Sequence, residues 1–299
     1  MPSVPSIMKV TNKHNLPEPV YKALSKDNYS MGDAEISVTT MIDSPRINIL
    51  RKKYWEELTE DVSDKLWSVL GTAVHNMFEA EASWDYILEE RLHITHKDWK
   101  ISGAIDVQKI NPDGTVSIAD YKCTSVWSVI YGKEEWVDQL NCYAWLVRNA
   151  KKKEVSELQI VAVLRDWKQR EAENNANYPQ APIVIIDIPI TEPEEQARII
   201  EVYLDQHADA RLAEMLGEPI AFCTDKQRWL RGEKWAVMKK GRKRAIKLYD
   251  NEEEAGKHCE ESTEKLFVEH REGEPTRCLQ DYCRVSQFCD QWRSNDRAG

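Results

Sequence analysis

The stretch from Ile101 to Lys122, ISGAIDVQKINPDGTVSIADYK, constrains the fold more than any other part of the chain. It predicts two antiparallel strands joined by a tight turn at residues 111–114, with the sequence Asn-Pro-Asp-Gly. Pro112 suits the first central position of a type I turn, and Gly114 can take the left-handed conformation that closes a three-residue loop. The turn therefore indicates a hairpin whose pairing can be worked out.

The turn also determines which residues of the two strands face each other. If Asn111 pairs with Thr115, Asp106 lies directly across from Asp120 on the same face of the sheet. Lys122 follows Asp120 by two residues and shares its face, because side chains alternate between the faces of a strand. The sequence thus predicts two carboxylates and an ammonium group close together.

Two carboxylates that face each other at about 5 Å repel, which destabilises a sheet by tenths of a kcal/mol or more. A shared proton or a bound divalent cation could offset the repulsion, and the ammonium group of Lys122 suits a site for an anionic substrate. The alternative is a solvated hairpin whose acids simply face water. Because Asp is disfavoured in strands, two aspartates in register favour a functional site.

The composition bounds the class of protein. With 299 residues and a hydrophobic fraction of 41%, the chain can form one large domain or two small ones. No apolar run approaches the roughly 20 residues that span a bilayer, and the first ten residues do not resemble a signal peptide, so we expect a soluble cytoplasmic protein without a membrane partner. A net charge of −10 argues against coating of nucleic acid through overall charge, but it allows local basic patches and an acidic metal pocket.

The pattern of apolar residues predicts a mixed α/β core, with a central mixed sheet flanked by helices. Helices are expected at residues 37–58, 63–82, 134–149 and 191–216, and Pro45 can interrupt or restart the first of them. Besides the hairpin, strands are expected at residues 86–94, 158–165 and 182–190.

Four segments are expected along the chain. Residues 1–34 form an extended or loosely docked arm, residues 35–217 form the core, residues 218–250 form an insertion with a basic hairpin, and residues 251–299 form a charged helix over 252–271 followed by clustered cysteines. The insertion hairpin pairs residues 234–238 with 245–249. Its tip, a candidate phosphate contact, carries five cations: Lys239, Lys240, Arg242, Lys243 and Arg244. A solvated, gatekeeping tip is the alternative.

Two of the predicted helices carry polar residues at a spacing of four. His75 and Glu79 share a face of the second helix, and Gly71, one turn earlier, would allow another backbone or a ligand to approach closely. Gln139 and Tyr143 have the same spacing in the third helix. Taken singly, these residues have ordinary explanations, such as a partly buried histidine, a solvated glutamine and a packed tyrosine.

Together, however, the motifs follow a familiar order: Gly71-x-x-x-His75, Gly103-Ala-Ile-Asp106, Asp120-Tyr-Lys122 and Gln139-x-x-x-Tyr143. Between residues 37 and 190 the chain resembles the RecB-type branch of the PD-(D/E)xK nucleases. This branch includes the CRISPR-adaptation exonucleases, the mitochondrial genome maintenance exonuclease and many phage and prophage proteins, to which the chain is most similar. The resemblance implies a restriction-endonuclease-like core with a C-terminal cysteine-bearing extension.

The resemblance also implies a role for each motif residue. The expected metal ligands are His75, Asp106, Asp120 and the backbone carbonyl of Tyr121. Lys122 would orient or activate the attacking water, and Gln139 and Tyr143 would position this lysine or the DNA backbone. Glu90, on the strand before the hairpin, resembles an accessory acid of some members.

The implied activity is metal-dependent hydrolysis of DNA by an exonuclease that acts on single strands or duplex ends. Oxygen ligands suit Mg²⁺, and one imidazole shifts the preference toward Mn²⁺. Phage recombination, replication or DNA processing is the implied setting, with a phage recombinase or helicase as a candidate partner. A noncatalytic nucleic-acid-binding or assembly subunit and an RNA-directed nuclease are the alternatives.

Three late cysteines, in the pattern Cys278-x₄-Cys283-x₅-Cys289, are similar to those that hold a [4Fe–4S] cluster in several members. Here the first gap is wider than the usual two residues, and no cysteine precedes the histidine motif. The fourth ligand is therefore open, with Cys223 as the first candidate and Cys259 as the second. A zinc site and a set of free thiols are the alternatives, and the odd total of seven cysteines argues against a disulfide framework.

Overall fold

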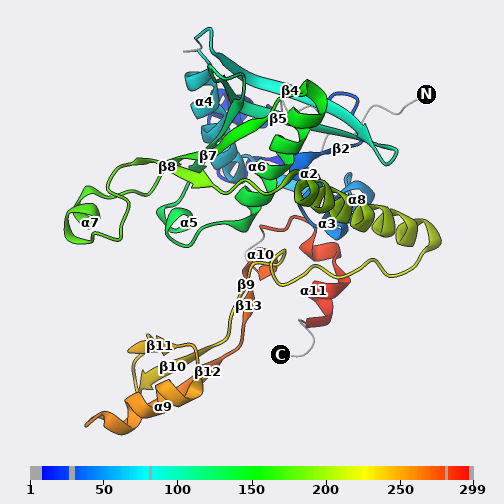
Figure 1. Cartoon of the computed structure of the whole chain (residues 1–299). Coiled ribbons are helices and arrows are strands. Elements are labelled where there is room, and N and C mark those ends of the chain that lie inside the picture. Colours follow the sequence, from blue (N-terminus) through cyan, green and yellow to red (C-terminus); the bar gives the residue numbers. More distant parts are fainter. Residues whose placement is uncertain (1–8, 27–30, 81–82, 280–281, 296–299) are drawn as a thin grey trace. The chain divides into compact units, whose positions relative to one another are not determined.

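The computed structural model describes residues 9–26, 31–80, 83–279 and 282–295 (Figure 1). The chain divides into two compact units. The first comprises Met1–Pro45 and Trp55–Glu218, and the second comprises Arg46–Tyr54 and Pro219–Gly299. The first unit thus ends next to residue 217, where we expected the core to end, but residues 46–54 belong to the second unit.

A six-stranded mixed sheet forms the centre of the first unit. Five of its strands follow the order β2-β5-β6-β7-β8, and the sixth, β4, also pairs with β5. β2 is parallel to β5 and β6 is parallel to β7, whereas the other pairs are antiparallel. The strands are β2 (Ile36–Ser37), β4 (Tyr86–His96), β5 (Trp99–Ile110), β6 (Val116–Thr124), β7 (Val155–Leu164) and β8 (Ile183–Ile188). The expected mixed sheet is confirmed, as are the strands that the apolar runs predicted.

The helices of this unit are α1 (Glu18–Ser25), α2 (Val38–Met41), α4 (Leu66–Glu79), α5 (Val126–Ile130), α6 (Glu134–Leu146), α7 (Gln169–Asn174) and α8 (Pro193–Leu216). α4 contacts β6, and α6 contacts the strands β5, β6 and β7 and the helix α8. α8 begins with a proline and two acidic residues and ends at Gly217, whose φ of +69° suits glycine. The resulting arrangement of helices around a sheet agrees with the predicted fold class.

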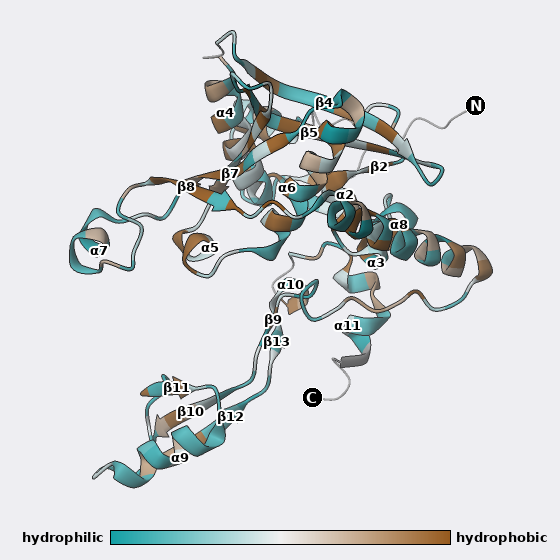
Figure 2. Ribbon diagram, in the orientation of Figure 1, coloured by the Kyte–Doolittle hydropathy of each residue, from teal (hydrophilic) through white to brown (hydrophobic). Residues whose placement is uncertain are grey.

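The core lies between the sheet and α6. Side chains from both are almost fully buried, among them Ile101, Ile105, Ile118, Leu140, Leu146, Leu158 and Ile160. Figure 2 shows these strands with many hydrophobic residues. Since full burial of one such side chain contributes about 1.5 to 3 kcal/mol, this layer holds α6 firmly against the sheet. The functional residues of α6 are therefore fixed relative to the strands.

The N-terminal arm is more structured than expected. β1 (Lys9–Thr11) pairs in parallel with β3 (Thr59–Asp61), and α1 is helical where the prolines predicted extended chain. Asp61 accepts hydrogen bonds from the Thr11 hydroxyl (2.9 Å) and the Lys13 backbone N–H (2.7 Å). Pro17 precedes the helix rather than interrupting it, which is the position where proline is tolerated. Residues 1–8 and 27–30 of the expected arm lie outside the described residues.

The second unit begins with most of α3 (Pro45–Lys53), which starts at Pro45 as the sequence allowed. Its side chains contact the later part of the unit: Arg46 donates to the carbonyl of Ile220 (2.6 Å) and pairs with Asp290, and Tyr54 stacks on Phe288. These contacts explain why the segment leaves the expected core.

The rest of the second unit consists of β9 (Leu230–Arg231), β10 (Lys234–Lys239), β11 (Lys247–Tyr249), α9 (Glu252–Glu261), β12 (Leu266–Arg271), β13 (Glu274–Pro275), α10 (Thr276–Leu279) and α11 (Asp290–Asn295). The insertion hairpin is present, with Trp235 opposite Tyr249. The helix expected over residues 252–271 is wrong in its second half, because residues 266–271 form β12 and pair with β10. Among all the residues described, no helix has both the length and the apolar character of a membrane span.

Candidate functional site

The hairpin between β5 and β6 has the predicted turn and register. The Asn111 N–H donates to the Thr115 carbonyl (2.9 Å), and the Gly114 N–H donates to the Asn111 carbonyl (2.9 Å), with Gly114 at a φ of +86°. Strand pairing runs from Ile110 opposite Val116 to residue 107 opposite residue 119. Asp106 and Asp120 therefore occupy the next opposing positions, as the turn predicted.

Next to this pair, a carboxylate rather than a backbone carbonyl accepts the hydrogen bond of a strand N–H group. Oδ2 of Asp106 accepts a hydrogen bond from the backbone N–H of Tyr121 at 2.7 Å. Both acids are buried, since Asp106 is 7% exposed and Asp120 is 1% exposed. Burial, together with the charge of Asp120, raises the pKa of Asp106 to about 7. The repulsion that the sequence predicted is thus present, and the charges of His75 and Lys122 offset only part of it.

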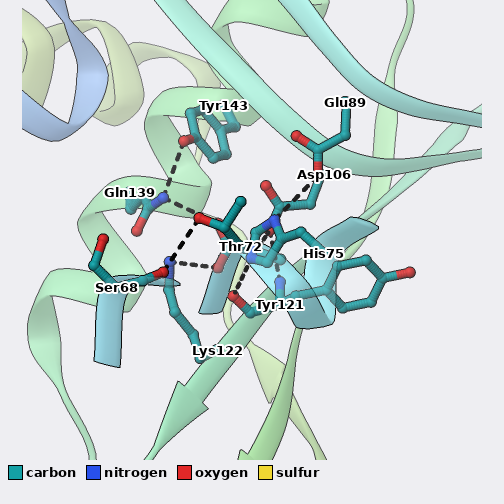
Figure 3. Close-up of polar contacts among 10 residues, drawn as sticks. Ser68, Thr72, His75, Glu89, Asp106, Tyr121, Lys122, Gln139 and Tyr143 are labelled. Atoms are coloured by element: carbon teal, nitrogen blue, oxygen red, sulfur yellow. Dashed lines mark hydrogen bonds and ion pairs between the residues drawn. The ribbon is translucent and has the colours of Figure 1, made fainter. Parts of the chain in front are cut away.

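Two side chains contact Asp120, and a third supports one of them. Its Oδ1 accepts a hydrogen bond from Nε2 of Gln139 at 3.0 Å, and Nζ of Lys122 lies 2.5 Å from its Oδ2. Gln139 also donates to the hydroxyl of Tyr143 at 2.9 Å, as their spacing of one helical turn on α6 allows. Burial and the charge of Asp120 raise the pKa of Tyr143, so this phenol stays neutral. Figure 3 shows these groups converging from β6 and α6.

His75 reaches the same place from α4. Its Nε2 lies 3.2 Å from the carbonyl oxygen of Tyr121 and 3.7 Å from Oδ2 of Asp106. Its Nδ1 lies 3.0 Å from Oε1 of Glu89 (Figure 3). The hydrogen bond to Glu89, followed by the charge of Asp106, raises the pKa of His75 to about 9 despite its partial burial. Sequence motifs from α4, β5, β6 and α6 therefore meet within a few ångströms.

Glu89 is a site residue that the sequence analysis missed. Among the described residues, one group of three His, Cys, Asp or Glu side chains brings its ligand atoms within 4.8 Å of one another, and it consists of His75, Glu89 and Asp106. Glu90, the expected accessory acid, instead accepts hydrogen bonds from Lys151 (2.6 Å) and from Gln108 (2.7 Å). The acid that lies beside the site is therefore Glu89, and not Glu90 as we expected.

The turn between β4 and β5 explains this difference. It has two residues, Lys97 and Asp98, both with positive φ (46° and 62°), and the resulting register puts Glu89 across from Asp106. Glu89 itself has a φ of +49°, which is unusual for this residue type. If the sequence had indicated a two-residue turn at Lys97 and Asp98, the register would have placed Glu89 opposite Asp106. Such turns are normally indicated by Asn-Gly or Asp-Gly, and this one is not.

Other expectations concern glycines and the polar face of α4. A Cβ on Gly71 would have no neighbour within 4 Å among the described residues, so no other backbone approaches this glycine closely, and the approach of a ligand stays a prediction. A Cβ on Gly103 would lie 2.5 Å from Cδ1 of Leu146, so here glycine is required where α6 crosses β5. Figure 3 also places Ser68 and Thr72 of α4 beside the site. The spacing of residues 68, 72 and 75, which puts their polar side chains on one face of α4, could have indicated them.

The donor set suits a divalent cation. It offers the His75 imidazole, the carboxylates of Asp106 and Asp120 and the carbonyl of Tyr121, the oxygen-rich combination that Mg²⁺ and Mn²⁺ accept. Oδ2 of Asp120 is buried and faces the Lys122 ammonium group at 2.5 Å, so one cation already balances this acid. The second buried acid, Asp106, lies beside Asp120 and has a raised pKa, which a further cation would relieve, so the residues fit the metal that the family resemblance implies.

The cysteine cluster lies in the second unit. One pocket is lined by Cys223, Cys278, Cys283 and Cys289, together with Arg46, Arg228 and Arg277. Nε of Arg46 donates to Sγ of Cys289 at 3.4 Å. Burial, followed by the neighbouring thiols, raises the pKa of Cys278 to about 11. The structure thus brings the first candidate for the fourth ligand to the other three, whereas Cys259 lies on α9 and does not line this pocket.

The basic tip of the insertion hairpin is exposed along residues 239–244. Lys239 is paired with Glu264 at 2.8 Å. The role of this tip as a phosphate contact stays a prediction.

The comparison with known families agrees with this geometry. The family model of the PD-(D/E)XK nuclease superfamily matches residues 34–290. No curated protein matches the chain significantly. Among solved structures, the crystal structure of SSO0001 is similar with a TM-score of 0.44 and 18% sequence identity, over 62% of this chain and 83% of that chain.

Proposed function

Because the chain belongs to the PD-(D/E)XK nuclease superfamily, we propose that it hydrolyses phosphodiester bonds in DNA with the help of a divalent metal ion. Membership in the superfamily indicates nuclease activity and a nucleic-acid substrate. The observation that carries the proposal is the meeting of His75, Asp106, Asp120 and Lys122 at the open end of the β5–β6 hairpin.

His75, Asp106, Asp120 and the carbonyl of Tyr121 would hold Mg²⁺ or Mn²⁺. A bound ion lowers the pKa of water and stabilises negative charge on phosphoryl oxygens. Glu89 would accept a hydrogen bond from the Nδ1–H of His75, which fixes the ring and leaves Nε2 as the metal-binding atom. This arrangement of carboxylate, imidazole and cation is common in metal sites.

The other residues act on the substrate through charge and position. The Lys122 ammonium group, beside Asp120, would orient the attacking water and stabilise the charge that develops on the phosphate. Gln139 holds Asp120 through one hydrogen bond and is itself held by Tyr143, so the carboxylate cannot rotate freely. Three strands and two helices thus fix the charges before substrate binds.

An exonuclease of phage or prophage origin, active in recombination, replication or DNA processing, is the finer form of the proposal. It is supported by the order of motifs, which resembles the RecB-type branch, and a recombinase or helicase is the partner that such a role would require. The digestion of end-labelled single-stranded, blunt and circular DNA with each metal tests it. Linear DNA should be degraded from its ends, and circles cut equally fast would replace exonuclease with endonuclease.

The rival proposal is a noncatalytic nucleic-acid-binding subunit with the same fold. Asp120→Ala separates the two, because cleavage by the purified protein should be lost while DNA binding persists. Cleavage that is unchanged in this variant would contradict our assignment of the site. The same assay with RNA tests whether the enzyme is directed at RNA.

We also propose that the four clustered cysteines hold a [4Fe–4S] cluster. Their thiolates are the usual ligands, and guanidinium groups surround them: Arg46 donates to Cys289, and the buried Nε–H of Arg228 has no acceptor among the described residues. Zinc bonds of about 2.3 Å in a tetrahedron require four sulfurs at van der Waals contact. No three of the described cysteines bring their sulfurs within 4.8 Å of one another, which favours a larger cluster.

Purification without oxygen tests the cluster. The expected preparation is brown and contains about four iron and four sulfide ions per chain, and Cys223→Ser should reduce both. A colourless preparation that binds one zinc ion would support the zinc alternative, and one without either metal would leave free thiols.

A further inference from the structure

A pair of exposed aromatic rings lies on α5, directly after the strand that carries Lys122. Trp127 is 56% exposed and Tyr131 is 79% exposed, yet their rings stack, with centroids 5.8 Å apart and planes at 17°. The two residues are one helical turn apart, and Figure 2 shows α5 as largely hydrophobic. Apolar groups that gather in the open in this way commonly mark an interaction surface.

A second flat pair joins Trp67 of α4 to Arg165, the residue that follows β7. The guanidinium group of Arg165 sits 4.4 Å from the ring centroid of Trp67, which is 51% exposed. Arg165 follows β7 and is itself exposed, so it adds a positive charge to this surface. The pair combines a π-face with a cation, which suits a ligand that carries both flat rings and negative charge.

Backbone contacts tie both pairs to the same edge of the sheet. The Arg165 N–H donates to the carbonyl of Thr124, the last residue of β6, at 3.0 Å. The Val126 N–H, at the start of α5, donates to Oδ1 of Asp166 at 2.7 Å. The two ring pairs therefore flank the carboxyl ends of the parallel strands β6 and β7.

This edge adjoins the candidate active site. Lys122 precedes Thr124 by two residues on β6, a distance of about 7 Å along a strand. The helix α4, which carries Trp67, contacts the strand β6, which carries Lys122. A nucleic-acid strand whose phosphate reaches Lys122 would thus bring its adjoining bases to the exposed rings.

We infer that Trp67, Arg165, Trp127 and Tyr131 form a base-stacking site that binds unpaired DNA next to the scissile phosphate. The inference rests on the proposed nuclease function and specifies the substrate at that site. Duplex DNA buries the faces of its bases, whereas an unpaired strand offers every base for stacking on aromatic rings and its phosphates to Arg165. The site therefore selects single strands or frayed ends over intact duplex.

The test compares two fluorescent oligonucleotides of equal length and charge, oligo(dT) and an abasic strand, in EDTA so that no cleavage occurs. The variants are Trp127→Ala/Tyr131→Ala and, as a matched control, Trp84→Ala, which removes a ring that is 98% exposed outside this surface. The unchanged protein should bind oligo(dT) at least about tenfold more tightly than the abasic strand, because each stacked base contributes. The double variant should lose this preference and the control should keep it.

Thermal unfolding of all the variants shows whether the fold is intact, which is expected because the replaced rings are more than half exposed. If the unchanged protein does not distinguish the two strands, or if the folded double variant keeps the preference, the stacking site is refuted. Self-association that the double variant loses, with oligo(dT) binding unchanged, would assign the surface to a second copy of the chain and also refute it. Cleavage of linear single-stranded DNA in Mg²⁺ and in Mn²⁺ is measured in parallel, and its absence in both would contradict the nuclease proposal without affecting the binding comparison.

Discussion

Gly103 shows how a single residue adapts the sheet to the helix that carries part of the site. A Cβ there would lie 2.5 Å from Cδ1 of Leu146 and 3.0 Å from the ring of Tyr143, and both side chains are buried. We expect Gly103→Ala to lower the free energy of unfolding by about 1 to 3 kcal/mol through overpacking. Urea denaturation measures this change.

The matched control is Gly71→Ala. Its Cβ has open space among the described residues, and alanine favours a helix over glycine by up to about 1 kcal/mol. Equal destabilisation by the two substitutions would contradict the packing role of Gly103.

Glu89 is the residue whose role the structure changes most. Its hydrogen bond to Nδ1 of His75 predicts that Glu89→Gln weakens Mn²⁺ binding by about 10- to 100-fold, because outer groups of this kind orient the metal ligand. Glu90→Gln serves as the control, since Glu90 contacts Lys151 and Gln108 instead. Titration calorimetry with Mn²⁺ measures both. Equal affinity of the two variants would argue against Glu89 as the positioning acid.

The acids and the histidine also predict how stability depends on pH without metal. Asp106 has a pKa of about 7 in the folded protein, above its ordinary 3.8, and His75 has a pKa of about 9, above 6.5. For each group, at pH values between its ordinary pKa and its raised pKa, the folded state binds more protons than the unfolded state. The free energy of unfolding therefore falls as the pH rises through each of these two intervals. In EDTA, we expect the Tm to fall between about pH 4 and about pH 9, and Asp106→Asn should flatten the part of this fall below about pH 7.

Excess Mn²⁺ should oppose this fall, because the ion requires ionised carboxylates and a neutral imidazole. Differential scanning calorimetry at several pH values measures the effect. A Tm that rises with pH in the metal-free protein would contradict the assigned pKa directions.

At the same scale, the sequence predicted some site residues and not others for a physical reason. Asp106 and Asp120 followed from a proline-glycine turn, whose conformation is nearly dictated by residue type. Glu89 depended on a Lys-Asp turn, in which two non-glycine residues take positive φ only because the paired strands impose it. Local chemistry indicates the first kind of turn, and only tertiary pairing reveals the second.

Among the elements, the insertion hairpin offers a separable test of DNA binding. Lys240, Arg242 and Lys243 are exposed at its tip, whereas Lys239 is paired with Glu264. Replacing the three exposed residues by alanine should reduce the salt dependence of duplex binding by about 0.9 in log–log slope for each phosphate that the tip no longer neutralises. Fluorescence anisotropy over a range of salt concentrations measures the slope.

Lys257→Ala on α9 is the control, because Lys257 is also exposed but is paired with Glu253. A slope that is unchanged in the triple variant would assign the tip to the solvated, gatekeeping role.

The same unit shows why helices and strands are harder to predict than turns. Residues 266–271 follow a charged helix, and their charged side chains suggested that the helix continues. They instead form a strand that pairs with β10, and this pairing decides their conformation.

For the whole molecule, the order of elements in the sequence predicted the mixed sheet and its covering helices, because apolar periodicity reports burial directly. The division into units could not be predicted in the same way. Residues 46–54 look like part of the first unit, but their partners, such as Asp290 and Phe288, lie far along the chain. No local pattern records a contact over that separation.

This discontinuity matters while the protein is being synthesised. Residues 46–54 leave the ribosome long before residues 219–292, and at ordinary translation rates the delay is on the order of ten seconds. During that time Ile47 and Leu50, which line the cysteine pocket in the finished protein, have none of their later neighbours. The nascent chain therefore passes through a stage in which the apolar side chains of this helix are exposed to solvent. Chaperones that recognise exposed apolar segments have time to bind it.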